Sequence, residues 1–151
     1  MRKGFACFLQ SMLLVTCANA QSAVVRDFGL LGEWASECSR PPSPANEHSL
    51  FALASSGAIW VLNNVGPYYD GMVYRIVEAE RIGSDKLSMR QVLTTDEAMV
   101  LDVVVLKDNE KIRVWSSHTA GGDTLVKDGI ASPTNRKTRW ATRCGERWAL
   151  D

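Results

Sequence analysis

Residues 34–38 read WASEC and residues 140–144 read WATRC, so a tryptophan stands four positions before a cysteine near each end of the chain. Period-two alternation places Trp34 and Cys38 on the same face of a strand that we expect over residues 33–38. The rest of the chain shows no internal repeat. We therefore interpret the two stretches as the two sides of one seam, where the first and last strands of the fold meet.

The sequence between these stretches alternates short β-type runs with turn residues. The expected strands are residues 33–38, 48–54, 58–65, 72–82, 86–93, 98–106, 111–119, 124–128 and 137–144. About nine such runs joined by short turns predict an all-β fold with an antiparallel, up-and-down meander. A short helical turn is expected before it, within residues 23–31, and Gly32 ends that turn.

The meander is expected to close into a small barrel of about eight strands, because closure removes the exposed edges of a sheet. One of the candidate strands would then be irregular. A β-sandwich is the structural alternative. It needs longer crossing connections, and only residues 40–44 and 129–136 offer candidates for them.

The number of strands decides which aromatic residues meet at the seam. With an even number, the first and last strands are antiparallel, and pairing Cys38 with Cys144 places Trp34 opposite Trp148. With an odd number the two strands are parallel, and Trp34 lies beside Trp140. We favour the even number.

The first twenty residues have the pattern of a secretory signal peptide. Two basic residues are followed by a mostly apolar run over residues 4–16, and residues 18–20 form an Ala-Asn-Ala cleavage site. The apolar run is too short to span a bilayer, so no transmembrane segment is expected. Cleavage after Ala20 leaves a single domain over residues 21–151, located in the bacterial periplasm or secreted.

Cys17 offers an alternative to cleavage after Ala20, as the lipidated cysteine of a lipoprotein. Thr16 is a poor residue before such a site, and we favour plain secretion.

Cleavage after Ala20 leaves Cys38 and Cys144 as the only cysteines, and these are expected to pair in an oxidising compartment. It also leaves fifteen basic residues against seventeen acidic ones, which argues against a nucleic-acid or anionic-membrane partner.

The sequence contains few of the residue patterns that are typical of catalytic sites. His48 and His118 are the only histidines and have no second ligand at metal spacing, so no metal is expected. Ser116, Ser117, His118 and Asp102 supply the residue types of a Ser-His-Asp hydrolase, but no nucleophile-elbow sequence accompanies them. No glycine-rich phosphate loop is present, and we expect neither a cofactor nor an enzyme.

Four aromatic residues are candidates for contacts with a ligand or partner. Tyr68 and Tyr69 lie in a loop bounded by glycines, where they either form a recognition surface or cover the end of the barrel. Trp60 and Trp115 lie on expected strands and either line an internal pocket or pack in the core.

The stretch Gly32-Glu33-Trp34, placed just after the helical turn, resembles the opening motif of lipocalins and related calycin barrels. The resemblance implies that Gly32 ends the entry turn and that Trp34 plugs the closed end of the barrel. It also implies that an arginine of the last strand, Arg143 or Arg139, packs across the tryptophan.

The resemblance implies a binding protein for a small apolar ligand. The chain is also similar in plan to small secreted barrels that inhibit bacterial proteases or lysozymes. The alternative function is therefore a protein-binding module, either such an inhibitor or an envelope accessory factor.

Overall fold

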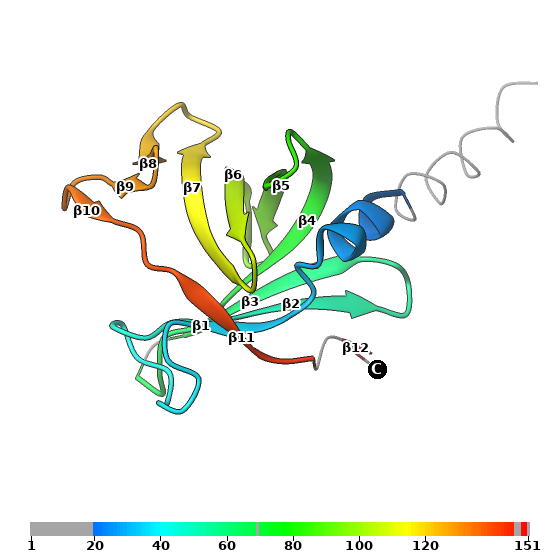
Figure 1. Cartoon of the computed structure of the whole chain (residues 1–151). Coiled ribbons are helices and arrows are strands. Elements are labelled where there is room, and N and C mark those ends of the chain that lie inside the picture. Colours follow the sequence, from blue (N-terminus) through cyan, green and yellow to red (C-terminus); the bar gives the residue numbers. More distant parts are fainter. Residues whose placement is uncertain (1–19, 69, 147–148, 151) are drawn as a thin grey trace, which may run out of the picture.

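Eight antiparallel strands close into a barrel in the computed structural model (Figure 1). The structure describes residues 20–68, 70–146 and 149–150. The expected signal sequence before residue 20, the candidate lipid site Cys17, and Tyr69 and Trp148 lie outside the described residues. The predictions of an all-β fold, of barrel closure and of an even strand number are confirmed.

A helix over residues 20–28 precedes the strands. The strands are β1 (Gly32–Ala35), β2 (His48–Ala54), β3 (Ile59–Asn64), β4 (Met72–Arg81), β5 (Lys86–Leu93), β6 (Asp96–Asp108), β7 (Lys111–Thr119), β8 (Thr124–Lys127), β9 (Ile130–Ala131), β10 (Arg136–Lys137), β11 (Ala141–Gly145) and β12 (Ala149–Leu150). No helix in the described ranges is long and apolar enough to cross a bilayer.

Strands β1 to β7 follow one another around the barrel, and β11 closes it between β7 and β1. The short strands β8, β9 and β10 extend from the free edge of β7 as a separate flap (Figure 1). Strand β12 pairs in parallel with the end of β2. The flap and β11 therefore share one edge: β8 pairs with the end of β7 at Ser117 and His118, and β11 pairs with its start at Lys111 and Ile112.

The alternation of side chains along the strands builds the core. In β5, Leu87, Met89 and Gln91 are buried, whereas Arg90 faces solvent. Apolar side chains from β1 to β7 meet inside the barrel in the same way. The helix adds Val25 and Phe28 to this cluster, so its apolar side chains close one end of the barrel.

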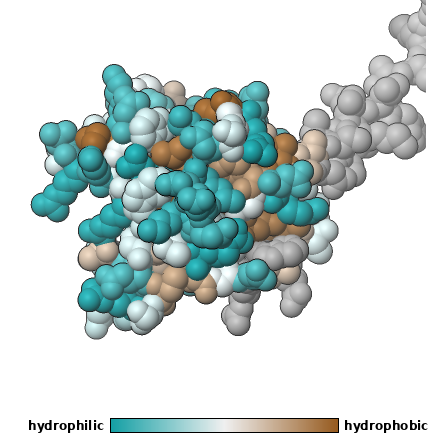
Figure 2. Space-filling model, in the orientation of Figure 1, coloured by the Kyte–Doolittle hydropathy of each residue, from teal (hydrophilic) through white to brown (hydrophobic). Residues whose placement is uncertain are grey.

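The helix is fixed across that end by contacts with two strands. The Gln21 side-chain amide donates to the carbonyl of Val77 on β4 at 2.6 Å. The Lys107 ammonium at the end of β6 donates to the carbonyl of Phe28 at 3.0 Å. The face of the molecule seen in Figure 2 is mostly hydrophilic, with small hydrophobic patches.

Cys38 and Cys144 form a disulfide, as the sequence predicts. The predicted pairing of Trp34 with Trp148 is wrong, because Arg143 occupies the position opposite Trp34. Strand β1 ends at Ala35, so Cys38 lies in the following loop rather than in the ladder. The disulfide therefore does not set the register of the two strands.

Candidate functional site

A cavity of about 300 Å³ opens between the β1–β2 loop and the connection from β10 to β11. Trp34, the most deeply buried of the lining residues, forms its floor. The apolar wall comes from Phe51, Val105, Ile112, Val114 and Ala141, and the more polar mouth from Ser36, Pro44, Glu47, Ser49, Thr138, Arg139 and Arg113. The cavity thus offers a mostly apolar interior and a polar entrance, which suits an amphipathic small molecule.

The floor of the cavity is rigid because Trp34 is held on two sides. The Trp34 side chain is fully buried, and its Nε1 donates to the Leu30 carbonyl at 2.8 Å. The Arg143 guanidinium lies 4.7 Å from the centroid of the indole ring. Arg143 also donates from Nη1 to the Leu31 carbonyl at 2.8 Å and from Nη2 to the Gly29 carbonyl. Arg143 therefore joins β11 to the entry segment and covers the tryptophan.

Gly32 permits the close approach of the two seam strands beneath this floor. Its φ of 128° lies in the region that favours glycine. A Cβ at this position would lie 2.7 Å from the Gly145 carbonyl oxygen on β11. Any larger residue would have to push the strands apart.

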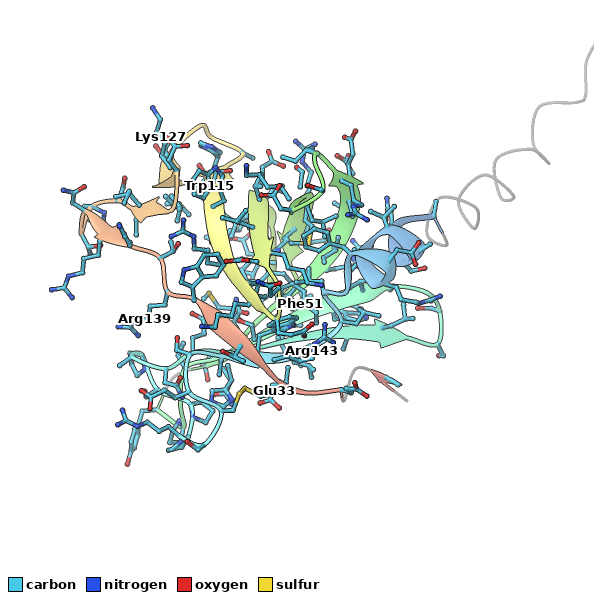
Figure 3. The ribbon with its side chains drawn as sticks, viewed as in Figure 1. Glu33, Phe51, Trp115, Lys127, Arg139 and Arg143 are labelled. Carbon is cyan, nitrogen blue, oxygen red and sulfur yellow. A yellow bond between two sulfur atoms is a disulfide. The ribbon has the colours of Figure 1, made fainter. Side chains whose placement is uncertain are left out.

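The β1–β2 loop forms one wall of the mouth and is anchored by a buried amide. The Asn46 side chain accepts from the Glu37 amide and donates to the Glu37 carbonyl, both at 3.0 Å. The disulfide fixes the start of the same loop. Across the mouth, the Arg139 guanidinium donates to the Ala45 carbonyl, and Figure 3 shows Arg139 extending toward this loop.

Glu47 places a carboxylate at the entrance. Its side chain keeps contact with solvent but is flanked by protein on the cavity wall, and this loss of hydration raises the pKa of the carboxyl. The Ser49 hydroxyl donates to Glu47 Oε1 at 3.4 Å and partly offsets the rise. Burial, and secondarily the charge of Glu47, raise the pKa of the Tyr74 hydroxyl.

The four aromatic candidates lie outside this cavity or beyond the described residues. Trp60 alternates with the buried Ile59 and Val61 and so points away from the interior. Trp115 lies at a bulge of β7, with the Lys86 ammonium and the Arg113 guanidinium each 5.2 Å from the ring centroid. Tyr68 is 93% exposed, so its ring does not cover the end of the barrel.

The residues nominated for a hydrolase do not assemble into a triad. His118 Nδ1 lies 3.2 Å from the Thr124 hydroxyl, and no hydrogen bond joins His118 to a serine in the described part of the chain. Arg90 donates to both Asp102 oxygens, at 2.8 and 3.1 Å, and this hydrogen bonding lowers the pKa of the Asp102 carboxyl.

The His48 ring contacts the Glu33 carboxylate. Its Nδ1 lies 2.9 Å from Glu33 Oε1, beside the seam. Within the described ranges, no group of three or more His, Cys, Asp or Glu side chains is placed to hold a metal ion.

Sequence reasoning missed the residues of the mouth. Glu47 is the last residue of the β1–β2 loop and Ser49 lies in β2. The alternation of β2 marks Ser49 as inward, but a glutamate in a loop is usually solvated. Comparisons of the chain with known protein families, with characterised proteins and with solved structures found no match.

Proposed function

We propose that the protein is an exported, lipocalin-like binding protein that holds a small, largely apolar molecule in the cavity above Trp34. The observation that carries the proposal is the cavity itself, which has a volume of about 300 Å³, apolar walls and a closed floor. This volume is at the lower limit of ligand pockets. At about 30 Å³ per atom, it accommodates roughly ten non-hydrogen atoms.

Two further features support the proposal. The stacking of Arg143 on Trp34, next to Gly32, is the arrangement that the lipocalin resemblance implies for the closed end of such a barrel. The Cys38–Cys144 disulfide favours an oxidising compartment, which is consistent with periplasmic location or secretion.

The binding role is tested by filling the cavity. Ala141→Leu adds volume to the wall, whereas Ala98→Leu makes the same change at an exposed position on β6. We expect n-octanol to bind the unchanged protein saturably in an NMR titration, with shifts at Val105 and Ile112. Ala141→Leu should weaken this binding at least about tenfold and Ala98→Leu should not.

Two results would refute the binding role. Absence of saturable binding, or equal affinity in the unchanged protein and Ala141→Leu, would show that the cavity is not a ligand site. Thermal unfolding of both variants provides the check that each is folded.

A protein-binding role is the second candidate, and the exposure of Tyr68 favours it. An aromatic side chain that is 93% exposed on the β3–β4 loop is typical of a recognition surface. If the protein inhibits a lysozyme or a bacterial protease, Tyr68→Ala should abolish the inhibition and Ala141→Leu should preserve it. Inhibition that Tyr68→Ala leaves unchanged would remove Tyr68 from the contact surface.

A further inference from the structure

A guanidinium at the mouth of the cavity has no negative partner. Arg113 lines the cavity, and its side chain makes neither an ion pair nor a hydrogen bond in the described part of the chain. Its Nε is buried and has no hydrogen-bond acceptor among the described residues. Buried polar atoms without a partner are rare in proteins. A guanidinium that is partly removed from water is stabilised by an anion brought to it.

The neighbours of Arg113 hold its guanidinium by the faces. The group lies 4.7 Å from the ring centroid of Trp140 and 5.2 Å from that of Trp115. Gly129 is buried beside it, and a Cβ on this glycine would lie 3.2 Å from Arg113 Cζ and 3.3 Å from Nη1. Because the N–H donors of a guanidinium lie in its plane, contacts with its faces leave these donors available. Arg113 therefore offers oriented donors that the protein itself does not use.

Arg139 adds a second positive charge to the lining of the same mouth. It donates to the Ala45 carbonyl, and no carboxylate pairs with it among the described residues. A guanidinium has five N–H donors, so the bond to Ala45 leaves Arg139 with donors for a ligand.

Glu47, the one acidic side chain among the described lining residues, does not neutralise the two arginines. No ion pair joins it to either of them within the described ranges. Burial raises the pKa of Glu47, whereas a guanidinium close to the carboxyl would lower it. Two arginines against one glutamate leave the lining with a net positive charge.

We propose that the cavity selects an anionic amphiphile, a small carboxylate with an apolar tail. The carboxylate binds the guanidinium of Arg113 at the mouth, and the tail lies against Phe51 and Trp34. A planar carboxylate matches the forked donors of a guanidinium, and the charge of Arg139 strengthens its attraction. Cationic amphiphiles of the same size are rejected, because the net charge of the lining repels their head group. This inference rests on the proposed binding function and specifies its ligand class.

Three probes of matched length and different head group test the inference by calorimetry at pH 7.5: n-octanoate, n-octanol and n-octylamine. We expect octanoate to bind at least about tenfold more tightly than octanol, and octylamine to bind most weakly. Octylamine that binds as tightly as octanoate would overturn the assignment of an anionic ligand.

Two variants of the cavity should change the preference for octanoate over octanol in opposite directions. Arg113→Gln removes the charge at the head group and should reduce the preference at least about fivefold. Glu47→Gln removes a repelling carboxylate and should raise the preference about two- to fivefold. Arg136→Gln, which removes a charge from the exposed strand β10, is the control and should keep the preference. A preference that Arg113→Gln leaves intact overturns the role of Arg113.

The bound carboxylate in the unchanged protein supplies a test that needs no variant. The NMR signal of octanoate labelled at its carboxyl carbon should titrate at a lower pH in the complex than in free solution, because the guanidinium groups favour the ionised form. A bound carboxyl whose pKa equals or exceeds that of free octanoate overturns the inference. Octanol binding without any preference for octanoate also overturns it but leaves the proposed binding function standing, whereas absence of binding by all three probes overturns both.

Discussion

Arg143 and Trp34 are register partners across the seam between β1 and β11, and the guanidinium of Arg143 also covers the Trp34 ring at 4.7 Å. The same guanidinium donates to the Leu31 and Gly29 carbonyls. One side chain thus connects the last barrel strand, the first strand and the segment that leads in from the helix. Changes at this contact should therefore affect the whole barrel.

Arg143→Lys should destabilise the protein although it keeps the positive charge. Lysine has neither the planar face that lies on Trp34 nor the forked donors for the two carbonyls. We expect the free energy of unfolding to fall by about 1–3 kcal/mol, measured by urea denaturation. Arg136→Lys on the exposed β10 is the control, and equal denaturation midpoints for both variants would contradict the assigned role.

Gly32→Ala should be destabilising, whereas Gly145→Ala should be nearly neutral. The two glycines lie close together across the seam, where Gly145 is the register partner of Glu33. Of the two, only Gly32 has a positive φ, and only at Gly32 would a Cβ meet a backbone oxygen. The expected cost at Gly32 is about 1–3 kcal/mol, observed as a lower Tm. A larger loss from Gly145→Ala would disprove this account of the seam.

Replacing both Cys38 and Cys144 by serine should reduce the free energy of unfolding by about 4–5 kcal/mol, because the loop that the disulfide closes is long. The two cysteines are 106 positions apart. Urea denaturation with and without dithiothreitol measures the effect. The reductant should destabilise the unchanged protein and leave the double variant unaffected; if both respond equally, the disulfide is not the source of the difference.

Glu47→Gln should stabilise the protein at neutral pH. Burial raises the pKa of Glu47, so its ionised form costs stability above that pKa. Glutamine removes this cost, and the variant should show the higher Tm at pH 8. As the pH falls through the raised pKa, the unchanged protein becomes protonated and the difference in Tm should decline.

Below the ordinary carboxyl pKa of 4.5 the two proteins should unfold at the same temperature. Glu80→Gln, at an exposed position of β4, should show no such pH-dependent gain. A Tm difference that grows on acidification would show that the Glu47 carboxylate is stabilised, rather than penalised, by its surroundings.

Local alternation in the sequence was sufficient to predict most of the barrel. The bounds predicted for β2, β5 and β7 match those observed, and the paired cysteines correctly indicated that the two chain ends meet. The bounds of a strand depend on residues that are neighbours in the sequence, and the disulfide pairing depends on the number of cysteines. Both could therefore be predicted without knowing which strands pack together.

The last strand was predicted less well because two segments compete for one edge of β7. Residues 137–144 alternate as one strand, but the flap occupies the end of β7, and β11 pairs only with its start. Thr138 instead turns its hydroxyl to the Val114 carbonyl at 2.7 Å. Such competition between distant segments leaves no local signal.

The candidate site was predicted only in part, for the same reason. The resemblance to the opening motif of lipocalins pointed to Gly32, Trp34 and Arg143. The mouth instead combines Glu47 from the β1–β2 loop with Arg139 from the connection before β11. Exposed aromatic residues such as Tyr68 are easier to notice in a sequence than a carboxylate whose importance depends on its surroundings.

The seam joins the first and the last barrel strands to be synthesised. Arg143 donates to the Leu31 carbonyl, 112 positions earlier in the chain, so the first strand gains its second neighbour only after β11 has been synthesised. Until then β1 has a free edge, and contacts of such long range make folding slow. Closure of the barrel therefore waits for β11, and a nascent chain stalled before residue 140 should expose the unpaired edge of β1 to chaperones or to other chains.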